Sequence, residues 1–159
     1  MPRLYRILIS EGSTHFNREA VFNHRTLEVR TRDKVNNSES ILPITERTYD
    51  TLSSFFYFRT IPLQVGTSYL IDIYDCKKLL NTKVKILRRE IVETPLGRFK
   101  TVVIEPLLKS EGIFSRTGAM LIWLTDDERH IPILMKSKVK IGSITTTLVG
   151  GTYWASGKK

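Results

Sequence analysis

Residues 119–141 constrain the fold of this chain more than any other stretch, because they form the clearest β-hairpin in the sequence. Residues 120–124 are uniformly apolar, and a polar break at 126–130 follows them. From residue 131 onward the odd-numbered positions are mostly apolar, whereas the opposite face carries Leu134, Lys136, Lys138 and Lys140. This period of two excludes a helix. The apolar first strand predicts a place in the middle of a sheet, covered on both faces.

The same β signal extends along most of the second half of the chain. Residues 69–74 alternate, a turn at 75–78 follows, and a long strand at 79–93 leads to the tight turn Thr94-Pro95-Leu96-Gly97. Residues 99–107 return from that turn, 110–117 form a loop, and 144–154 close the fold. The apolar phase of the long strand shifts past Arg88 and Arg89, which predicts a β-bulge that curves the sheet.

The first part of the chain has a weaker pattern. Residues 4–10 alternate as a strand, and 20–23 and 27–31 are two short strand candidates. We expect the polar run 30–40 to be a turn or a mobile loop. Residues 41–44 contain Pro43 and form an edge strand at most. We also expect earlier strands of the same domain to precede residue 1.

A single short helix is predicted over residues 50–59. Asp50 caps its first turn, Leu52, Phe55, Phe56 and Arg59 recur at helical spacing, and Pro62 prevents continuation. The four aromatic residues 55–58 have two interpretations. They could line a ligand cradle or dip into a membrane, but packing into one end of a curved sheet is favoured, because such a helix needs bulky side chains all round.

Length and charge set further limits. The chain has 159 residues, so we expect one all-β domain over 1–154, with a disordered tail at 155–159. Its 25 basic against 16 acidic residues give a net charge of +9, which favours anionic partners such as lipid headgroups, polysaccharide or nucleic acid. No stretch approaches the roughly 18 apolar residues of a membrane span. The start, MPRLYRILIS, does not match a secretory signal peptide.

Residues that could carry chemistry are few. Asp126, Asp127 and Glu128 lie beside His130 and could act as general acid and base or hold a divalent cation. Consecutive carboxylates in a hairpin turn are usually solvated, however, and Arg129 can neutralise them. The single cysteine, Cys76, excludes an internal disulfide and a cysteine-based zinc cluster. No nucleotide-binding or hydrolase motif is present, so we expect no catalytic residues, no metal and no cofactor.

Five lysines form a candidate site for an anionic surface. The tetrapeptide Lys-Val-Lys-Ile occurs at 83–86 and again at 138–141. If the two strands were neighbours, a positive stripe would result, made of Lys83, Lys85, Lys136, Lys138 and Lys140. The alternative is an ordinary solvated face whose lysines protect a sheet edge from pairing. Nucleic acid is a weak candidate partner, because the aromatic residues lie mostly in apolar phase.

Three blocks of the sequence resemble a known family. They are the aromatic helix with Arg59-Thr60-Ile61-Pro62-Leu63, the turn at 94–97, and Ile122-Trp123-Leu124-Thr125-Asp126-Asp127. Together they are similar to the domain-of-unknown-function family number 3108, from about residue 52 to residue 149. The resemblance implies an exported all-β protein of the periplasm or cell envelope, normally made with a signal peptide, with a curved antiparallel sheet or half-barrel like that of lipoprotein carriers. It implies no activity.

The function we expect is therefore that of a non-enzymatic envelope protein that binds or carries a lipid-like, hydrophobic ligand. The candidate groove residues are Phe55, Phe56, Phe58 and Trp123. One alternative is a structural or assembly module that docks an envelope partner through an open sheet edge. Another is a hydrolase that uses the cluster at 126–130.

Overall fold

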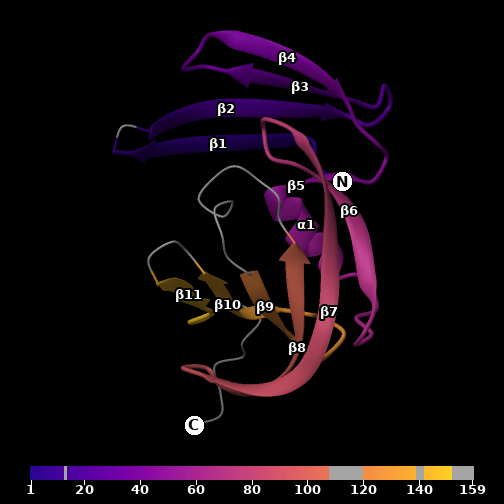
Figure 1. The fold of residues 1–159 in the computed structure, drawn as a ribbon, viewed down its shortest axis with the longest axis vertical. Helices are drawn as coiled ribbons and strands as arrows, with labels where there is room; N and C mark the ends of the chain where they lie inside the picture. Colours follow the sequence, from indigo (N-terminus) through magenta and orange to yellow (C-terminus); the bar gives the residue numbers. More distant parts are fainter. Residues whose placement is uncertain (13, 108–119, 139–141, 152–159) are drawn as a thin grey trace. The chain divides into compact units, whose positions relative to one another are not determined.

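The structure is a computed structural model and describes residues 1–12, 14–107, 120–138 and 142–151. These residues form eleven strands and one short helix (Figure 1). They divide into two compact units, Met1–Tyr57 with Leu70–Thr82, and Phe58–Tyr69 with Lys83–Lys159. We call them unit 1 and unit 2. The expected single domain over 1–154 stays a prediction, and the tail at 155–159 lies outside the described residues.

Unit 1 begins with an antiparallel sheet of four strands in the order β1-β2-β3-β4. The strands are β1 Leu4–Glu11, β2 Thr14–Asn23, β3 Glu28–Asp33 and β4 Ser38–Pro43. The strand at 4–10 and the edge strand containing Pro43 are confirmed. The loop predicted over 30–40 is wrong, because β3 and β4 pair there. Polar residues sustain this pairing: Arg32 donates to Glu39 across the strands at 2.7 Å.

The inner face of this sheet holds the core of unit 1. Alternate residues of β3 point inward and are buried, as the period of two requires. Val29 of β3 packs in one cluster with Ala20 and Phe22 of β2, with Ile44 after β4, and with Tyr74 and Cys76 at and just after the end of β6. The Tyr74 hydroxyl is not left unpaired in this core, because it shares a hydrogen bond of 2.7 Å with Thr31.

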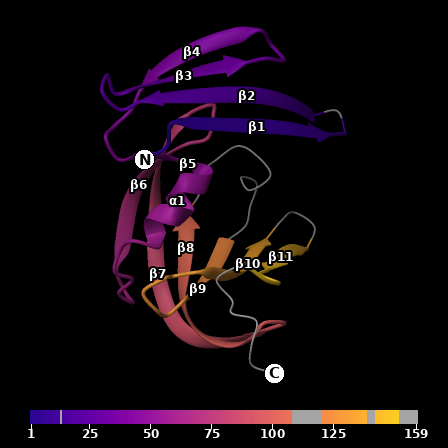
Figure 2. The same cartoon turned by 180° about the vertical axis from the view of Figure 1, so that it is seen from behind.

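A short strand leads directly into the helix. β5 Thr48–Asp50 pairs in parallel with β6 Ser68–Tyr74, and α1 Thr51–Phe58 starts at the next residue. The Asp50 carboxylate accepts from the backbone N–H groups of Leu52 and Ser53 at 2.8 and 3.0 Å, which satisfies two free donors of the first turn. The predicted helix and its cap are confirmed, and α1 lies beside β6 in both views (Figures 1 and 2).

The remaining strands form an antiparallel meander whose main part is unit 2. The strands are β7 Leu79–Thr94, β8 Gly97–Leu107, β9 Met120–Thr125, β10 Pro132–Lys138 and β11 Ser143–Thr147. The strand order of this second sheet is β11-β10-β9-β8-β7-β6-β5. The hairpin of β9 and β10 is confirmed, and β9 is central and buried on both faces, as predicted.

The bulge predicted in the long strand is also confirmed. The pairing of β7 with β8 shifts by one residue between Ile86 and Arg88, and β7 bends in its second half (Figure 1). The fold class, all-β and mainly antiparallel with one short helix, is thus confirmed. No helix in the described ranges is long and apolar enough to cross a membrane. The predicted loop at 110–117 and the chain at 139–141 and 152–154 lie outside those ranges.

Candidate functional site

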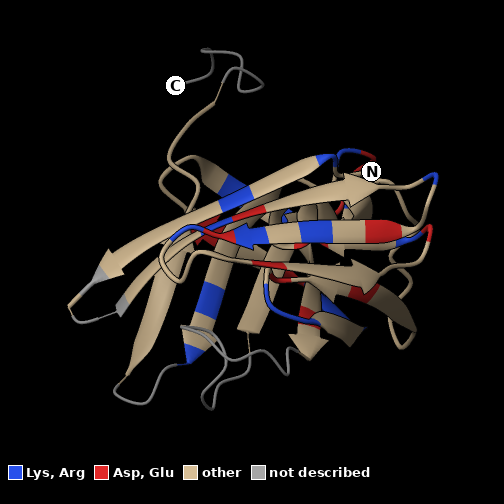
Figure 3. Ribbon diagram, turned by 90° about the horizontal axis from the view of Figure 1, so that it is seen from above, with Lys and Arg blue, Asp and Glu red and all other residues tan. Residues whose placement is uncertain are grey.

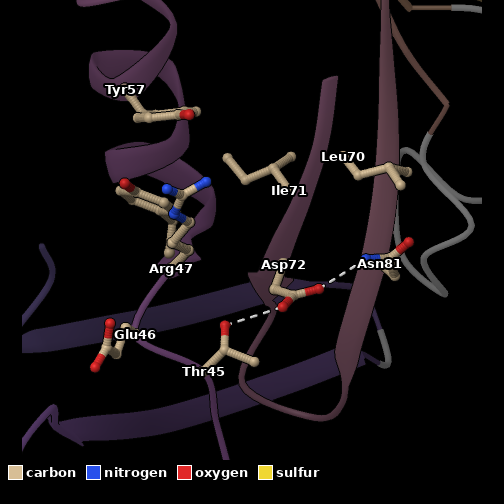
Figure 4. Close-up of a pocket in the computed structure, with 9 residues that line it drawn as sticks. Thr45, Glu46, Arg47, Tyr57, Leu70, Ile71, Asp72 and Asn81 are labelled. Atoms are coloured by element: carbon tan, nitrogen blue, oxygen red, sulfur yellow. Dashed lines mark hydrogen bonds between the residues drawn. The ribbon is translucent and has the colours of Figure 1, made fainter. Parts of the chain in front are cut away.

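A pocket of about 360 Å³ opens in unit 1 between the segment before α1, the helix itself, and the strands β6 and β7 (Figure 4). Its lining combines two tyrosines and two aliphatic side chains with five polar residues. The lining residues are Thr45, Glu46, Arg47, Tyr49, Tyr57, Leu70, Ile71, Asp72 and Asn81.

Asp72 is held in a fixed orientation on one side of the pocket. One carboxylate oxygen accepts from the Thr45 hydroxyl at 3.0 Å, and the other accepts from the Asn81 amide at 2.9 Å (Figure 4). Thr45 is itself tied to Thr48 at the start of β5, because its backbone N–H donates to the Thr48 hydroxyl. Asp72 therefore has a donor on each oxygen from within the pocket wall.

The aromatic wall consists of Tyr49 on β5 and Tyr57 on α1. Their ring centroids are 4.8 Å apart and the ring planes are tilted by 30°, which is within the range of favourable aromatic pairs. Burial raises the pKa of Tyr49, with the nearby Tyr57 acting in the same direction and the positive charge of Arg47 acting against it. The Tyr49 phenol therefore carries its proton at neutral pH and can donate a hydrogen bond.

The two charged residues next to each other, Glu46 and Arg47, point in different directions. The Arg47 guanidinium extends toward the side of the pocket where Tyr57 and Ile71 lie, whereas the Glu46 carboxylate points away from them (Figure 4). The described part of the chain provides no ion-pair partner within 4.0 Å for Arg47, although other arginines there form such pairs, among them Arg18, Arg89 and Arg129. Arg47 is thus a cation at the pocket without a direct carboxylate partner among the described residues.

None of the four predicted groove residues lines this pocket. Phe58 is buried, whereas Phe56 is 63% exposed and Phe55 is half-buried. Trp123 is buried in a cluster with Val103 and Ile133 in unit 2, and its indole N–H donates to Glu90. Phe55 and Phe56 belong to unit 1, whereas Phe58 and Trp123 belong to unit 2. Their role as a ligand groove stays a prediction.

The lysines of the repeated tetrapeptide are not on neighbouring strands. Lys83 and Lys85 lie on β7, Lys136 and Lys138 lie on β10, and β8 and β9 separate the two strands. Lys85 pairs with Glu105 at 3.8 Å, and the Lys136 ammonium lies 5.6 Å from the centre of the Trp123 ring. Lys140 lies outside the described residues. β7 and β10 are therefore not neighbouring strands, as a five-lysine stripe would require.

Charges elsewhere in the described chain are largely interleaved. Basic and acidic segments alternate over the four-stranded sheet (Figure 3), where Arg6 pairs with Glu19 and Arg32 pairs with Glu39. On its inner face Arg18 pairs with Asp33 at 2.8 Å. The hydrogen bond from Arg18, with a second from Asn36, holds the pKa of Asp33 far below its usual range. These ion pairs join neighbouring strands of the four-stranded sheet.

The acidic cluster at the hairpin turn is bound up in local contacts. Asp126 pairs with Arg89 at 2.9 Å, and Asp127 pairs with Arg129 at 2.6 Å. Asp127 also accepts from the Thr125 hydroxyl, which in turn accepts from the backbone N–H of Ile131. Within the described ranges, no three side chains of His, Cys, Asp or Glu gather in a way that could hold a metal ion.

Sequence reasoning missed the pocket because its residues have no common motif. They come from residues 45–49, 57, 70–72 and 81, and the parallel pairing of β5 with β6 brings the first and third groups together. The one usable signal was the helix prediction, since the cap at Asp50 fixes where Tyr57 lies. In the sequence, Thr45-Glu46-Arg47 before a helix is typical of a polar loop.

A comparison with known families finds a match over most of the chain. The family described as "Protein of unknown function (DUF3108)" matches residues 1–149, which is most of the chain. No curated protein and no solved structure matches it.

Proposed function

The chain belongs to the DUF3108 family of proteins of unknown function, and from this premise we propose that it is a non-enzymatic binding protein that holds a lipid-like ligand in the pocket of unit 1. The ligand has an apolar part and a polar head. The observation that carries the proposal is the pocket itself, whose volume of about 360 Å³ exceeds the roughly 300 Å³ at which ligand sites begin.

The lining of the pocket suits such a ligand. Tyr49, Tyr57, Leu70 and Ile71 provide an apolar surface, and on the polar side Asp72 is held in place by hydrogen bonds from Thr45 and Asn81. Ligand sites typically combine a mostly apolar wall with a small number of oriented polar groups. The Leu70 side chain is 69% exposed, so a ligand that covers it gains about 25 cal/mol for each Å² of apolar surface removed from water.

The paired charges of the hairpin turn support a role without catalysis. Each of Asp126 and Asp127 has an arginine partner, and a carboxylate that serves as general acid or base needs access to the group that it protonates or deprotonates. We also propose a location in the periplasm or at the cell envelope, which the resemblance to exported proteins supports.

Native mass spectrometry of gently purified protein, with organic extraction of the same sample, tests the proposal. We expect a stoichiometric added mass that extracts as an amphiphile, and we expect Leu70→Trp to reduce it by filling the pocket entrance. Ile41→Trp is the matched control, because Ile41 is an exposed aliphatic residue on the outer face of β4.

A bare mass, together with no binding of added amphiphiles to the pocket, would overturn the proposal. Equal loss of ligand in Leu70→Trp and Ile41→Trp would also contradict it, because the ligand would then lie elsewhere. Circular dichroism of both variants checks that each retains the wild-type fold.

A second candidate function, docking of a partner chain at a sheet edge, is favoured by β1. This strand ends the order of the four-stranded sheet among the described residues, and it exposes Leu4 and Leu8, the latter by 77%. An edge strand with exposed apolar residues favours pairing with another chain, whereas charged side chains on an edge discourage it. Light scattering of the wild type and of Leu8→Lys separates the two functions: an oligomer that dissociates in the variant favours docking, and an unchanged monomer does not.

A further inference from the structure

We infer that the ligand head group is a single anion, a carboxylate or a phosphate, and that Arg47 binds it. This inference rests on the proposed function, since it names the chemistry of the ligand held by the same pocket. Its structural basis is one unpaired guanidinium beside an aromatic and aliphatic wall.

The pocket has three charged groups, and Arg47 is the one cation among them. Asp72 already accepts one hydrogen bond on each carboxylate oxygen, from Thr45 and from Asn81. The Glu46 carboxylate points away from Tyr57 and Ile71 (Figure 4). Arg47 has no carboxylate partner within 4.0 Å in the described part of the chain, and its guanidinium lies on the side of Tyr57 and Ile71.

Hydrogen-bond chemistry indicates that the head group carries a negative charge. The guanidinium of Arg47 can only donate, and its planar geometry matches a carboxylate or a phosphate. The Tyr49 hydroxyl is a second donor in the same pocket. Of these two donors the guanidinium is charged, and it can bind an anion through charge-assisted hydrogen bonds, which are roughly twice as strong as neutral ones.

The net charge of the whole chain also favours a negatively charged head group. The net charge of +9 raises the local concentration of anions around the protein. A cationic head would meet the repulsion of Arg47, and it would share the Asp72 carboxylate with the Thr45 and Asn81 donors. A neutral alcohol would bind through its chain but would leave the guanidinium without a charged partner.

Chemical-shift titrations of ¹⁵N-labelled protein test the inference with four ligands that share one chain: octanoate, octyl phosphate, 1-octanol and octylamine. We expect the two anions to bind about tenfold more tightly than 1-octanol, as one charge-assisted contact to an exposed arginine allows. Octylamine should bind more weakly than 1-octanol. The largest shifts should fall on residues 45–49, 57 and 70–72.

Two arginine variants form a matched pair for this test. Arg47→Gln removes the charge and keeps a polar side chain, so it should lower the affinity for octanoate about tenfold and leave that for 1-octanol unchanged. Arg30→Gln makes the same change at an exposed residue on β3, away from the pocket. It should leave both affinities unchanged. If both variants weakened octanoate equally, the effect would come from net charge and the inference would fail.

The outcomes separate this inference from the proposed function. Equal affinity for octanoate and 1-octanol would overturn the anion and leave the binding function standing. Tightest binding of octylamine would overturn it in favour of Asp72 as the group that binds the head. Absence of shifts at the lining residues with all four ligands would overturn the proposed function itself. A preference between octanoate and octyl phosphate, each above 1-octanol, supports the inference and distinguishes a fatty acid from a phospholipid-like ligand.

Discussion

The hairpin turn of unit 2 and the pocket of unit 1 use charged residues in opposite ways. In the turn, two carboxylates and their arginine partners satisfy one another, through Asp126 with Arg89 and Asp127 with Arg129. In the pocket, the lining residues come from four separate parts of the chain, and Arg47 remains without an ion-pair partner among the described residues. The turn is conspicuous in the sequence, whereas the pocket is not.

The difference shows why clustering along the chain is a poor guide to a binding site. Neighbours in a tight turn are close enough to neutralise each other, so their charges stabilise the turn and are not offered to a ligand. In the pocket, Arg47 has no carboxylate within 4.0 Å among the described residues. A charge left over at a pocket is therefore a better indication of binding than a run of charges in a loop.

The largest expected effect comes from breaking the turn at Thr125. Its hydroxyl accepts from the buried N–H of Ile131 at 2.8 Å and donates to Asp127 at 2.7 Å. Thr125→Val keeps the shape but leaves that N–H without a partner, so the free energy of unfolding should fall by about 1–3 kcal/mol. Urea denaturation measures this loss. Thr146→Val, at an exposed position of β11, is the control and should change stability little.

Ligand binding in Thr125→Val should match the wild type under native conditions, because no pocket residue lies in the turn. Weakened octanoate binding in a folded Thr125→Val protein would show that the two regions are coupled, and the contrast between them would fail.

The second prediction concerns the helix cap that positions the aromatic wall. Asp50→Ala removes the acceptor for the N–H groups of Leu52 and Ser53, and the free energy of unfolding should fall by about 1 kcal/mol. Because α1 carries Tyr57, the same variant should also weaken octanoate binding. Asp50→Ser restores a capping oxygen and should recover both properties. Loss of stability with unchanged affinity would show that Tyr57 does not depend on the cap.

Much of the fold follows from the sequence, because its strongest patterns are local. The alternation in residues 131–138, the bulge near Arg88, the turn at 94–97 and the cap at Asp50 each depend on a few neighbouring residues. The polar strands β3 and β4 could not be found in this way. Their stability comes from cross-strand pairs such as Arg32 with Glu39, which an unpaired segment does not display.

The candidate site depends on tertiary pairing, so it could not be predicted from local sequence patterns. Asp72 becomes a pocket residue only through the register of β5 with β6, which places Thr48 opposite it, and through the contact with Asn81 on β7. The aromatic run at 55–58 drew attention, yet Tyr57 is its only member in the pocket, and its partner Tyr49 lies outside the run. Parallel pairing of a three-residue strand leaves no periodic signal to detect.

A third prediction uses pH to separate the turn from the pocket. Burial raises the pKa of Asp127, but hydrogen bonds from Thr125 and Arg129 outweigh this effect and lower it below its ordinary value. A carboxylate with a lowered pKa in the folded state stabilises the protein above the unfolded pKa of about 4, and this contribution is lost as the pH falls through the folded pKa. The Asp127 side chain is 38% exposed, so solvent screens its ion pair. Asp127→Asn should therefore cost no more than about 0.5–1 kcal/mol near neutral pH, and progressively less below about pH 4.

Denaturation of the wild type and Asp127→Asn across this pH range measures the difference directly. Octanoate affinity should be the same in both proteins at each pH where both are folded. A stability difference that grew toward acid pH would mean that the pKa of Asp127 is raised in the folded state, and the turn would then resemble a site for proton transfer.

The smallest effect is expected for Asp126→Asn. The ion pair with Arg89 is solvated, with side chains 28% and 53% exposed, and such pairs contribute roughly 0–1 kcal/mol, less at high salt. Stability should therefore change by no more than about 0.5 kcal/mol, as measured by urea denaturation at low and high salt, and ligand binding should not change. Arg88→Gln, which breaks the similar exposed pair with Glu90, is the matched control.

If Asp126→Asn instead abolished a measured hydrolytic turnover while its stability stayed at the wild-type value, the carboxylate would act on a substrate. The paired charges of the turn would then be a working site, and the contrast with the pocket would be broken.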